Sequence, residues 1–393
     1  MVTPILLTEY QPHTLPAAAF SETAAKILWQ HYDAQVNLEP PSFKTNNQWL
    51  FQPQGWVGHI PLTADTGLTI QPKVPLDNLF RMLEVAYQIA FKVLEGDIQA
   101  GSLAEFYERL ANILAQRTLL RARQGLHRAY IPYQERLPAV RGRLDLRQTL
   151  QKPWLAHLPC DYEEHTADIA DNQILAWTLG RIIHSNLCSS RTLPTIRRAY
   201  RTLQGTVTQI PFNAADCLNR LYHRLNDDYR PLHGLCRFFL EQSGPSHHLG
   251  DRVMVPFLVD MAALYEKFVA QWLHQNLPPH LALRAQENIA VDESGRLQIV
   301  IDLVIIDKDS GQTRFVLDTK YKAPDKAAND DIYQVAFYAR AKNSPRALLI
   351  YPTPLPTPLN IYQDGIHIQS TTFPLQGDLD ENGRAFLSAL ENV

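Results

Sequence analysis

Three charged side chains interrupt two segments that are otherwise apolar. Asp302 lies within the run 297–306, and Asp318 and Lys320 lie within the run 314–322. Burying a charge is unfavourable unless the charge is paired or bound to a metal ion. Two carboxylates and a lysine placed in this way are typical of a metal-dependent phosphodiesterase site.

The spacing predicts a hairpin that brings the two carboxylates together. Asp302 and Asp318 are equally distant from Ser310, which lies in a turn-like segment. A hairpin turning there would place their Cβ atoms about 5 Å apart. Lys320 would share the face of Asp318, because side chains alternate along a strand. Two ionised carboxylates at this distance repel each other, and a hard divalent ion such as Mg²⁺ or Mn²⁺ between them would convert the repulsion into coordination.

The flanking segments predict the elements that position this hairpin. In residues 259–273 apolar side chains recur every four positions, as in a helix, and Glu266 lies on that segment. Gln334 and Tyr338 are four residues apart in a second helical segment, so they share a helix face. The predicted order is helix, three strands, helix and strand, over residues 259–273, 281–291, 297–306, 314–322, 330–341 and 346–351.

This order and these charged residues resemble the PD-(D/E)xK nuclease superfamily. Gln334 and Tyr338 are similar to the Q-x-x-x-Y element of its RecB-like branch. The sequence Asp-Thr-Lys-Tyr-Lys at 318–322, following Leu-Tyr-Glu-Lys-Phe at 264–268, resembles more narrowly the McrC family. Further segments similar to that family are 57–60, 70–74, 140–144 and 171–175. Ile301 stands where the superfamily pattern has proline.

The resemblance implies a metal-dependent DNA endonuclease and assigns roles to individual residues. One or two Mg²⁺ ions, or Mn²⁺, would bind Asp302, Asp318 and the backbone carbonyl of Thr319. Glu266 maps to the acid of the first helix, with Glu287 on the next strand as the alternative. Lys320 would orient the attacking water and offset charge on the phosphate. The pair introduced above, Gln334 and Tyr338, would support the site.

The resemblance also implies a partner. In that family the nuclease subunit works with a separate AAA+ GTPase, an McrB-like hexamer, which binds GTP and recognises double-stranded DNA with modified cytosine. The present sequence agrees in two respects. It has no G-x-x-x-x-G-K-[ST] motif for a nucleotide. Its net charge of −3 lacks the basic field of a protein that holds DNA alone.

Three alternatives remain open. The first is a RecB-like nuclease that acts without a GTPase. The second is a non-catalytic adaptor that only activates a GTPase. The third is a glycosidase with paired carboxylates, which would have no need for a lysine on the strand face of Asp318. A neighbouring AAA+ gene product and GTP dependence of cutting would separate the first from the complex described above. The intact Asp302, Asp318 and Lys320 argue against the second.

The predicted elements indicate an α+β protein, and the length indicates more than one domain. At 393 residues and 45% hydrophobic content, the chain can form several cores. We expect a mixed β and helical partner-binding region over 1–245, a PD-(D/E)xK domain over 250–360 and a tail over 361–393. Residues 1–75 look strand-like around Trp49, Phe51 and Trp56, and helices are expected within 77–124, at 172–186 and, interrupted near Pro231, at 216–241. No secretory signal or membrane span is evident, so we expect a cytoplasmic protein.

Overall fold

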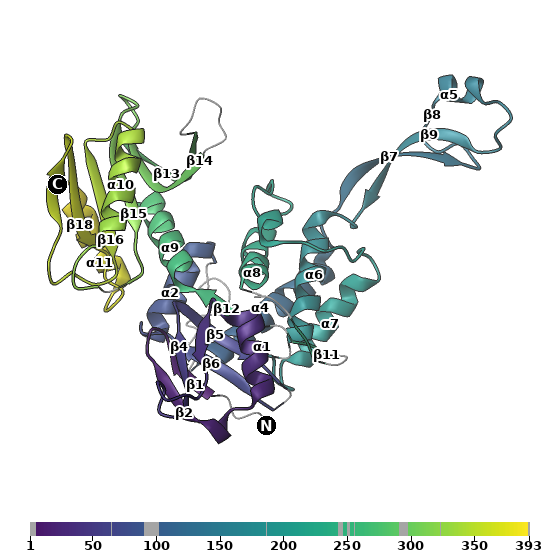
Figure 1. Cartoon of the computed structure of the whole chain (residues 1–393). Coiled ribbons are helices and arrows are strands. Elements are labelled where there is room, and N and C mark those ends of the chain that lie inside the picture. The colour runs from purple at the N-terminus through teal and green to yellow at the C-terminus, as the bar shows by residue number, and fades with distance from the viewer. Residues whose placement is uncertain are drawn as a thin grey trace. The chain divides into compact units, whose positions relative to one another are not determined.

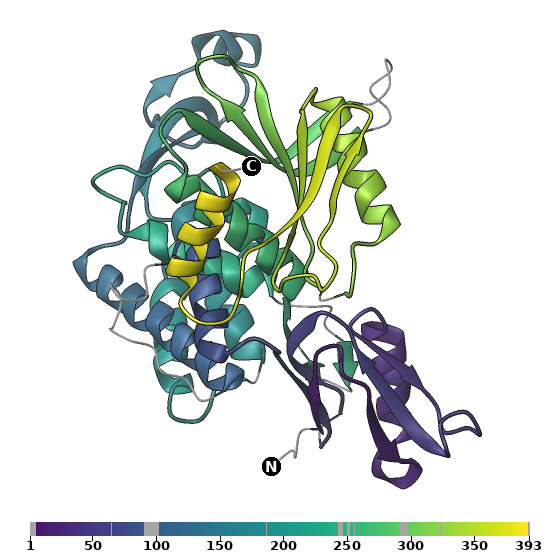
Figure 2. The same ribbon diagram turned by 90° about the vertical axis from the view of Figure 1, so that its left-hand side faces the viewer.

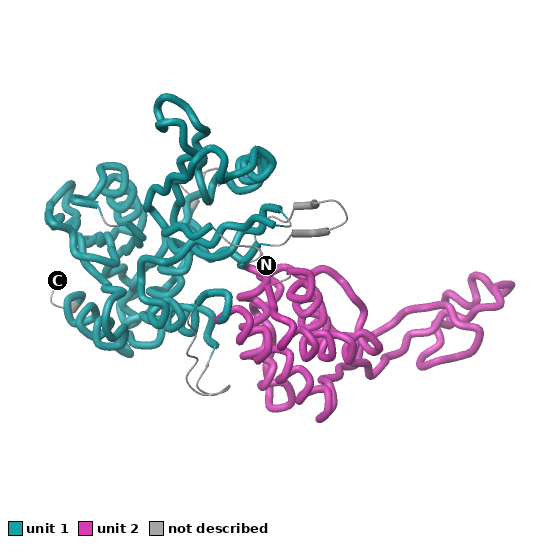
Figure 3. The backbone as a smooth tube through the Cα atoms, turned by 90° about the horizontal axis from the view of Figure 1, so that it is seen from below, with its two compact units in different colours: residues 1–105, 242–393 teal, residues 106–241 magenta. Residues whose placement is uncertain are grey.

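The computed structural model divides the chain into two compact units. It describes residues 5–63, 65–89, 102–185, 187–242, 247–249, 252–254, 256–290, 298–322 and 324–391 (Figure 1). Unit 1 comprises Met1–Glu105 with Gln242–Val393, and unit 2 comprises Phe106–Glu241 (Figure 3). The break before Gln242 lies close to the boundary expected between residues 245 and 250. The N-terminal region expected over 1–245 is nevertheless divided, because residues 1–105 pack with the C-terminal part of the chain.

Unit 1 contains the predicted nuclease elements around one six-stranded sheet. The strand order is β13-β14-β15-β16-β18-β17. These strands are β13 (Leu281–Ala290), β14 (Gln298–Asp307), β15 (Thr313–Thr319), β16 (Arg346–Tyr351), β17 (Asn360–Gln363) and β18 (Ile366–Thr372). The helices of this region are α9 (Met261–Asn276), α10 (Asn329–Ala341) and α11 (Leu379–Glu391). The mixed α and β fold and the predicted order of helix, three strands, helix and strand are confirmed.

Helices cover both faces of this sheet. α10 lies on one face and α11 on the other (Figure 2). Phe373 links α11 to α9, because its ring contacts Phe268 and Trp272 of α9 and Phe386 of α11. Val335 of α10 belongs to the core on the opposite face. Residues 361–393, expected as a tail, complete the sheet with β17 and β18 and add α11.

The β14–β15 hairpin forms where the sequence predicted it. Asp307 ends β14, and its carboxylate accepts the backbone N–H of Ser310 at 2.9 Å. Gly311 closes the turn with φ of +70°, a conformation that glycine adopts without strain. A bulge between Ile305 and Ile306 shifts the register by one residue. Beyond the bulge, the pairs from Ile305–Phe315 to Leu303–Leu317 are symmetric about Ser310.

Helix α9 begins two residues later than expected. Residues 259 and 260 belong to β12 (Phe257–Asp260), which pairs with β5 (Trp56–Pro61) in an antiparallel ladder. Asp260 then caps α9 by accepting the backbone N–H of Ala262 at 2.9 Å. A contact between residues so far apart in the sequence leaves no local periodic signal, so the prediction extended the helix too far.

The N-terminal part of unit 1 is built on two small sheets, β1-β6-β5-β12 and β2-β4-β3. The elements not yet named are β1 (Ile5–Thr8), β2 (His13–Pro16), η1 (Ala17–Ala19), α1 (Glu22–Tyr32), β3 (Val36–Glu39), β4 (Gln48–Pro53), β6 (Gly67–Gln71), α2 (Leu76–Tyr87), β10 (His247–Leu249) and β11 (Arg252–Met254). Trp49 and Phe51 are buried in a shared core, with Trp56 packed against it, as predicted. Helix α1 was not predicted, although Ser21 caps it through the N–H of Ala24.

Unit 2 combines helices with a β arm. Its elements are α4 (Leu103–Gln124), β7 (Ala129–Leu137), β8 (Arg143–Leu144), α5 (Leu146–Gln151), β9 (Leu158–Thr166), α6 (Ala170–Ser185), α7 (Leu193–Gln204), η2 (Ala214–Cys217) and α8 (Tyr229–Glu241). The arm is the long antiparallel pair β7 and β9, to which β8 adds a short third strand. Pro231 does not interrupt a helix, as had been expected, but lies in the first turn of α8, where proline is compatible with helical geometry.

The helices of the described ranges were also compared with the requirements of a bilayer. None of them combines the length and the apolar content that crossing one requires.

Candidate functional site

The two acids predicted to converge do so on neighbouring strands. Leu303 of β14 pairs with Leu317 of β15, so the next positions, Asp302 and Asp318, face each other across the ladder. The backbone N–H of Thr319 donates to Oδ2 of Asp302 at 3.2 Å. The Asp318 side chain is only 1% exposed. Local strand alternation and the symmetric hairpin therefore place both carboxylates where the sequence indicated.

Lys320 joins the carboxylates to the pair on α10. Its ammonium lies 2.7 Å from Oδ2 of Asp318. It also donates to Oε1 of Gln334 at 3.0 Å, and Nε2 of Gln334 donates to the hydroxyl of Tyr338 at 2.8 Å. The structure thus links four of the predicted site residues in one chain, through an ion pair from Asp318 to Lys320 and hydrogen bonds from Lys320 to Gln334 and from Gln334 to Tyr338.

The two candidates for the third acid have different surroundings. Burial raises the pKa of Glu266, and the negative charge of Asp302 raises it further. Glu287 instead forms ion pairs with Lys342 at 2.9 Å and Arg284 at 3.2 Å. Burial acts to raise the pKa of Glu287, but these cations outweigh it and the net pKa is lowered. Glu266 is therefore the acid within electrostatic reach of Asp302, whereas cations already neutralise Glu287.

A further carboxylate in the site was not predicted. Asp331, in the first turn of α10, is 8% exposed. Its Oδ1 lies 3.7 Å from the ammonium of Lys320, and its Oδ2 lies 2.5 Å from that of Lys322. The available signal was the position of Asp331 three residues before Gln334, which puts both on one helix face. Only the packing of α10 against the sheet buries that face.

Gln286 was also missed, and its backbone is unusual. It lies on β13 between Ala285 and Glu287, whose partners on β14 flank Asp302, and its φ is +52°. A left-handed residue that is not glycine stores about 1 kcal/mol or more of strain, and such strain clusters at functional sites. The side-chain amide of Gln286 donates to Oε1 of Glu266. The strained backbone thus directs an amide toward the acid on α9.

Burial shapes the electrostatics of the carboxylate pair. Burial raises the pKa of Asp318, and the nearby charge of Asp302 adds to the effect, so that the pKa reaches about 7 despite Lys320. The pKa of Asp302 is also raised, chiefly by burial. For Lys320, burial acts to lower the pKa, but the charge of Asp318 outweighs it and the net pKa is raised. The pair binds a proton readily because its negative charges are poorly solvated.

A divalent cation fits this donor set. Within the described ranges no group of three or more His, Cys, Asp or Glu side chains is arranged to hold a metal ion. Two converging carboxylates and the carbonyl of Thr319 still offer only oxygen donors, which suit Mg²⁺ and Mn²⁺. A cation would also relieve the poorly solvated charge that now raises the pKa of both acids. The residues Asp302, Asp318 and Thr319, with Glu266 nearby, are those that could hold it.

The site lies inside a segment shared with a known family. Residues 51–352 match the family model described as McrBC 5-methylcytosine restriction system component. The chain is also similar to the Type IV methyl-directed restriction enzyme EcoKMcrBC of Escherichia coli K12, with 24% identity over 217 residues. That match covers 53% of this chain and 61% of the relative, so the chain spans less than two thirds of the relative's length.

A solved structure shares the fold. The chain is similar to one in the refined half-complex from the tetradecameric assembly of Thermococcus gammatolerans McrB AAA+ hexamers with bound McrC. The TM-score is 0.57 at 18% identity, over 99% of this chain and 100% of that one. At this identity the likeness shows a common fold over nearly the full length of both chains.

Proposed function

The chain belongs to the McrBC family of 5-methylcytosine restriction system components, and from this we propose that it is the metal-dependent DNA endonuclease subunit of a GTP-driven, modification-dependent restriction complex. The observation that supports this most directly is the convergence of Asp302, in the middle of β14, with Asp318 and Lys320 at the end of β15. Metal-dependent hydrolysis of a phosphodiester uses carboxylates to hold the cation and a fixed positive charge near the phosphate, and these three residues can supply both.

The residues of the site have different roles in the proposed hydrolysis. When bound, a divalent cation supplies charge neutralisation at the phosphate and a lowered pKa for water. Asp302, Asp318 and the carbonyl of Thr319 would hold it, with Glu266 as a further oxygen donor. Lys320 orients the attacking water and offsets negative charge that develops on the phosphate.

Neighbouring side chains prepare the lysine for that role. Gln334 accepts a hydrogen bond from Lys320 at 3.0 Å and is itself bound to Tyr338. These bonds fix the direction of the ammonium before substrate arrives. Because the lysine is already ordered, less conformational freedom is lost on reaching the transition state.

We propose that an AAA+ GTPase, an McrB-like hexamer, supplies what this chain lacks. The sequence has no Walker A motif and a net charge of −3. GTP and modified cytosine in double-stranded DNA would therefore be bound by the partner, in the cytoplasm, while this chain stimulates GTP hydrolysis and cuts. We place the partner contact within residues 1–245 and the nuclease site within 250–360.

The β arm of unit 2 offers a surface for that contact. Its far end exposes apolar side chains on and around α5, including Leu146 (64%), Leu150 (79%) and Trp154 (75%). Exposed apolar side chains gathered in one place mark interaction sites rather than ordinary solvated surface. Tryptophan is also among the residues that most often dominate binding energy at interfaces.

The test combines the purified chain with the AAA+ protein encoded beside it, plasmid DNA with methylated cytosine, Mg²⁺ and GTP. Omitting any one component should abolish cutting. Cutting without the GTPase or GTP would instead support the RecB-like alternative. Stimulated GTP hydrolysis with no cutting, in either Mg²⁺ or Mn²⁺, would support the adaptor. Both outcomes contradict the proposal.

A further inference from the structure

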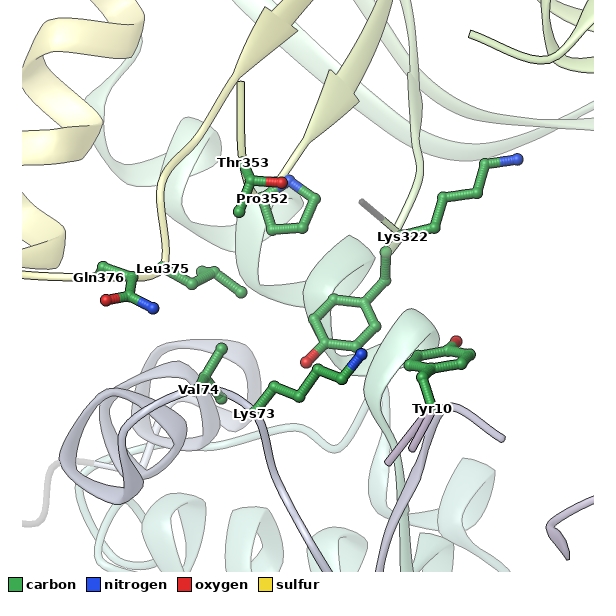
Figure 4. A pocket seen from close by; sticks show the side chains of 9 residues that line it. Tyr10, Lys73, Val74, Lys322, Pro352, Thr353, Leu375 and Gln376 are labelled. Carbon is green, nitrogen blue, oxygen red and sulfur yellow. The ribbon is translucent and has the colours of Figure 1, made fainter. Parts of the chain in front are cut away.

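Unit 1 contains a pocket of about 110 Å³ (Figure 4). Tyr321 and Lys322 line it and directly follow Lys320 in the chain, so the pocket adjoins the candidate metal site. Its walls are five loops, and each follows the carboxyl end of a strand in a parallel pair. The strands are β1 and β6, which pair in parallel, and β15, β16 and β18, which form a second parallel set. Crevices at the carboxyl ends of parallel strands are the usual ligand sites of α/β sheets.

The lining suits a flat ring that carries a negative charge. Pro352 and Leu375 provide apolar walls, and Tyr10 and Tyr321 provide aromatic ones. Lys73 supplies a cation at the same pocket, with its ammonium 5.1 Å from the centre of the Tyr10 ring. A cavity of ~150 Å³ accommodates a benzene molecule, and this pocket is smaller, at about 110 Å³, so it takes in only part of one aromatic ring.

Tyr10 is held in a strained conformation at this pocket. Its φ is +57°, which is a genuine outlier for a bulky residue. Strain of this kind persists where the surroundings fix the residue, and it clusters at ligand sites. The backbone N–H of Tyr10 is fixed by the carbonyl of Pro53 at 3.0 Å, while its side chain remains 42% exposed. The hydroxyl end of the ring packs against Gly55, and the ring also lines the pocket.

Glu9 fixes the two sides of the pocket to each other. It is fully buried, and its Oε1 accepts from the backbone N–H of Lys73 at 2.7 Å and from the hydroxyl of Tyr321 at 2.8 Å. Tyr321 directly follows Lys320, and the next residue, Lys322, reaches Asp331 in the metal site. One short loop therefore forms part of both the pocket and the catalytic cluster.

We propose that this pocket binds one unpaired nucleotide of the DNA strand, next to the phosphodiester that is cut. The base stacks on Tyr10 between the apolar walls, and its phosphate pairs with the ammonium of Lys73. Only a nucleotide outside the duplex stack presents a free ring face. The inference rests on the proposed nuclease function, because it is the adjoining carboxylate site that makes a DNA strand the ligand.

The test uses the full chain carrying Asp318→Asn, so that substrate is not cut, and measures binding of a fluorescent oligothymidylate by anisotropy. Adding Tyr10→Ala should weaken binding about 5- to 100-fold, whereas Tyr10→Phe should keep it. Adding Lys73→Ala should lower the slope of log affinity against log salt by about 0.7. Tyr362→Ala and Lys26→Ala, exposed residues elsewhere in unit 1, are the matched controls and should change nothing.

Two further ligands test whether the pocket is occupied by a nucleotide of a DNA strand. An oligonucleotide in which every position is abasic should bind the Asp318→Asn chain as weakly as oligothymidylate binds the same chain carrying Tyr10→Ala. Free thymidine monophosphate should bind much more weakly than the oligonucleotide. Equal affinity for the abasic strand, equal affinity for the free nucleotide, or unchanged binding by Tyr10→Ala would each overturn the proposal.

Failure of the pocket can be separated from failure of the nuclease assignment. If the pocket variants bind DNA normally while Asp318→Asn still abolishes cutting in the complete complex, the pocket proposal is wrong and the proposed function stands. If Asp318→Asn cuts normally, the proposed function is wrong, whatever the binding data show.

Discussion

The ammonium of Lys320 lies 2.7 Å from Oδ2 of Asp318, and both groups are largely removed from solvent. In the protein alone, the lysine is thus the main counter-ion of the more deeply buried carboxylate. It cannot fully offset the combined burial and repulsion, because the pKa of Asp318 still rises to about 7. The site is therefore built for more positive charge than its own lysine provides.

Removing either member of that ion pair should abolish cutting without loss of assembly. For Asp318→Asn and Lys320→Ala we expect cleavage to fall by about 10³-fold or more, because transition-state charge loses its stabilisation. Cleavage of methylated plasmid in the complete complex measures the first effect, and co-elution with the GTPase measures the second. Asp309→Asn, an exposed acid in the turn of the same hairpin, is the control and should cut normally. Full cleavage by either site variant would refute the assignment.

The pH dependence of stability should reveal the strain in the carboxylate pair. A folded pKa raised to about 7, above about 3.9 in the unfolded chain, contributes stability at low pH that is lost as the pH rises toward and through 7. Between pH 5 and pH 8, the free energy of unfolding of the metal-free protein should therefore fall by about 1–3 kcal/mol more than that of Asp318→Asn. Urea unfolding at each pH measures this, and Mg²⁺ should restore stability at pH 8 in the wild type alone. A pH-independent difference between the two proteins would contradict it.

Substitution of Gln286 should lower cleavage without lowering stability. Gln286→Gly removes the strain of a φ of +52° and should leave stability unchanged or raise it by up to about 1 kcal/mol. The same change removes the amide that bonds Glu266, so cleavage should fall by about tenfold. Asn343→Gly is the matched control. Asn343 also has a positive φ, of +50°, and it follows the C-terminal end of α10, outside the site. Equal cleavage by both variants would show that the amide has no role.

Trp154 should contribute to partner binding and not to folding. Its side chain is 75% exposed in the arm of unit 2, so Trp154→Ala should leave the melting temperature unchanged. We expect affinity for the GTPase to fall by about tenfold or more, as for an aromatic residue that anchors an interface. Trp29→Ala, which removes a tryptophan that is 64% exposed on α1, is the control. Weakened binding in the control alone would move the contact to unit 1.

Asp171 should hold the helical unit together. Its carboxylate contacts His127 at 3.0 Å, Arg220 and Asn226, and it is only 9% exposed. Burial acts to raise its pKa, but Arg220 outweighs burial and the net pKa is lowered. This stability is present above about pH 3.9 and lost as the pH falls through the folded value.

The ion pair of Asp171 can be tested both by substitution and by changing the pH. Asp171→Ala should destabilise the protein by about 3–5 kcal/mol, because it leaves a charged partner without its counter-ion. Asp227→Asn, a change at a surface acid that is 68% exposed, should have little effect. Urea midpoints between pH 3 and 6 test both statements. A wild-type midpoint no more acid-sensitive than that of Asp171→Asn would contradict the pKa argument.

Local patterns accounted for much of the sheet and its charged residues. β16 (Arg346–Tyr351) has both ends where the apolar run predicted them. Helix α10 begins one residue before the predicted start. Such runs can be predicted because burial repeats with the period of the element itself. Asp302 and Asp318 could be identified for the same reason, since they are charged residues at positions where that repeat is otherwise apolar.

Long-range packing accounted for what was missed. The joining of residues 1–105 to the C-terminal sheet depends on β12 pairing with β5, and the hairpin of β17 and β18 is held by its parallel neighbour β16. Asp331 looks like an ordinary acid in a helix first turn until the sheet covers it. Gln286 looks like a solvated strand residue until its backbone turns left-handed. None of these contacts leaves a periodic trace in the sequence.

The order of residues by itself determined that two acids and a lysine would meet on one strand face, because alternation and turn position are properties of a short segment. Only the tertiary structure decided how poorly solvated those charges are, which further side chains reach them, and that five strand ends enclose a pocket next to them. Solvation and enclosure depend on which surfaces of distant segments come into contact, and folding of the whole chain sets those contacts.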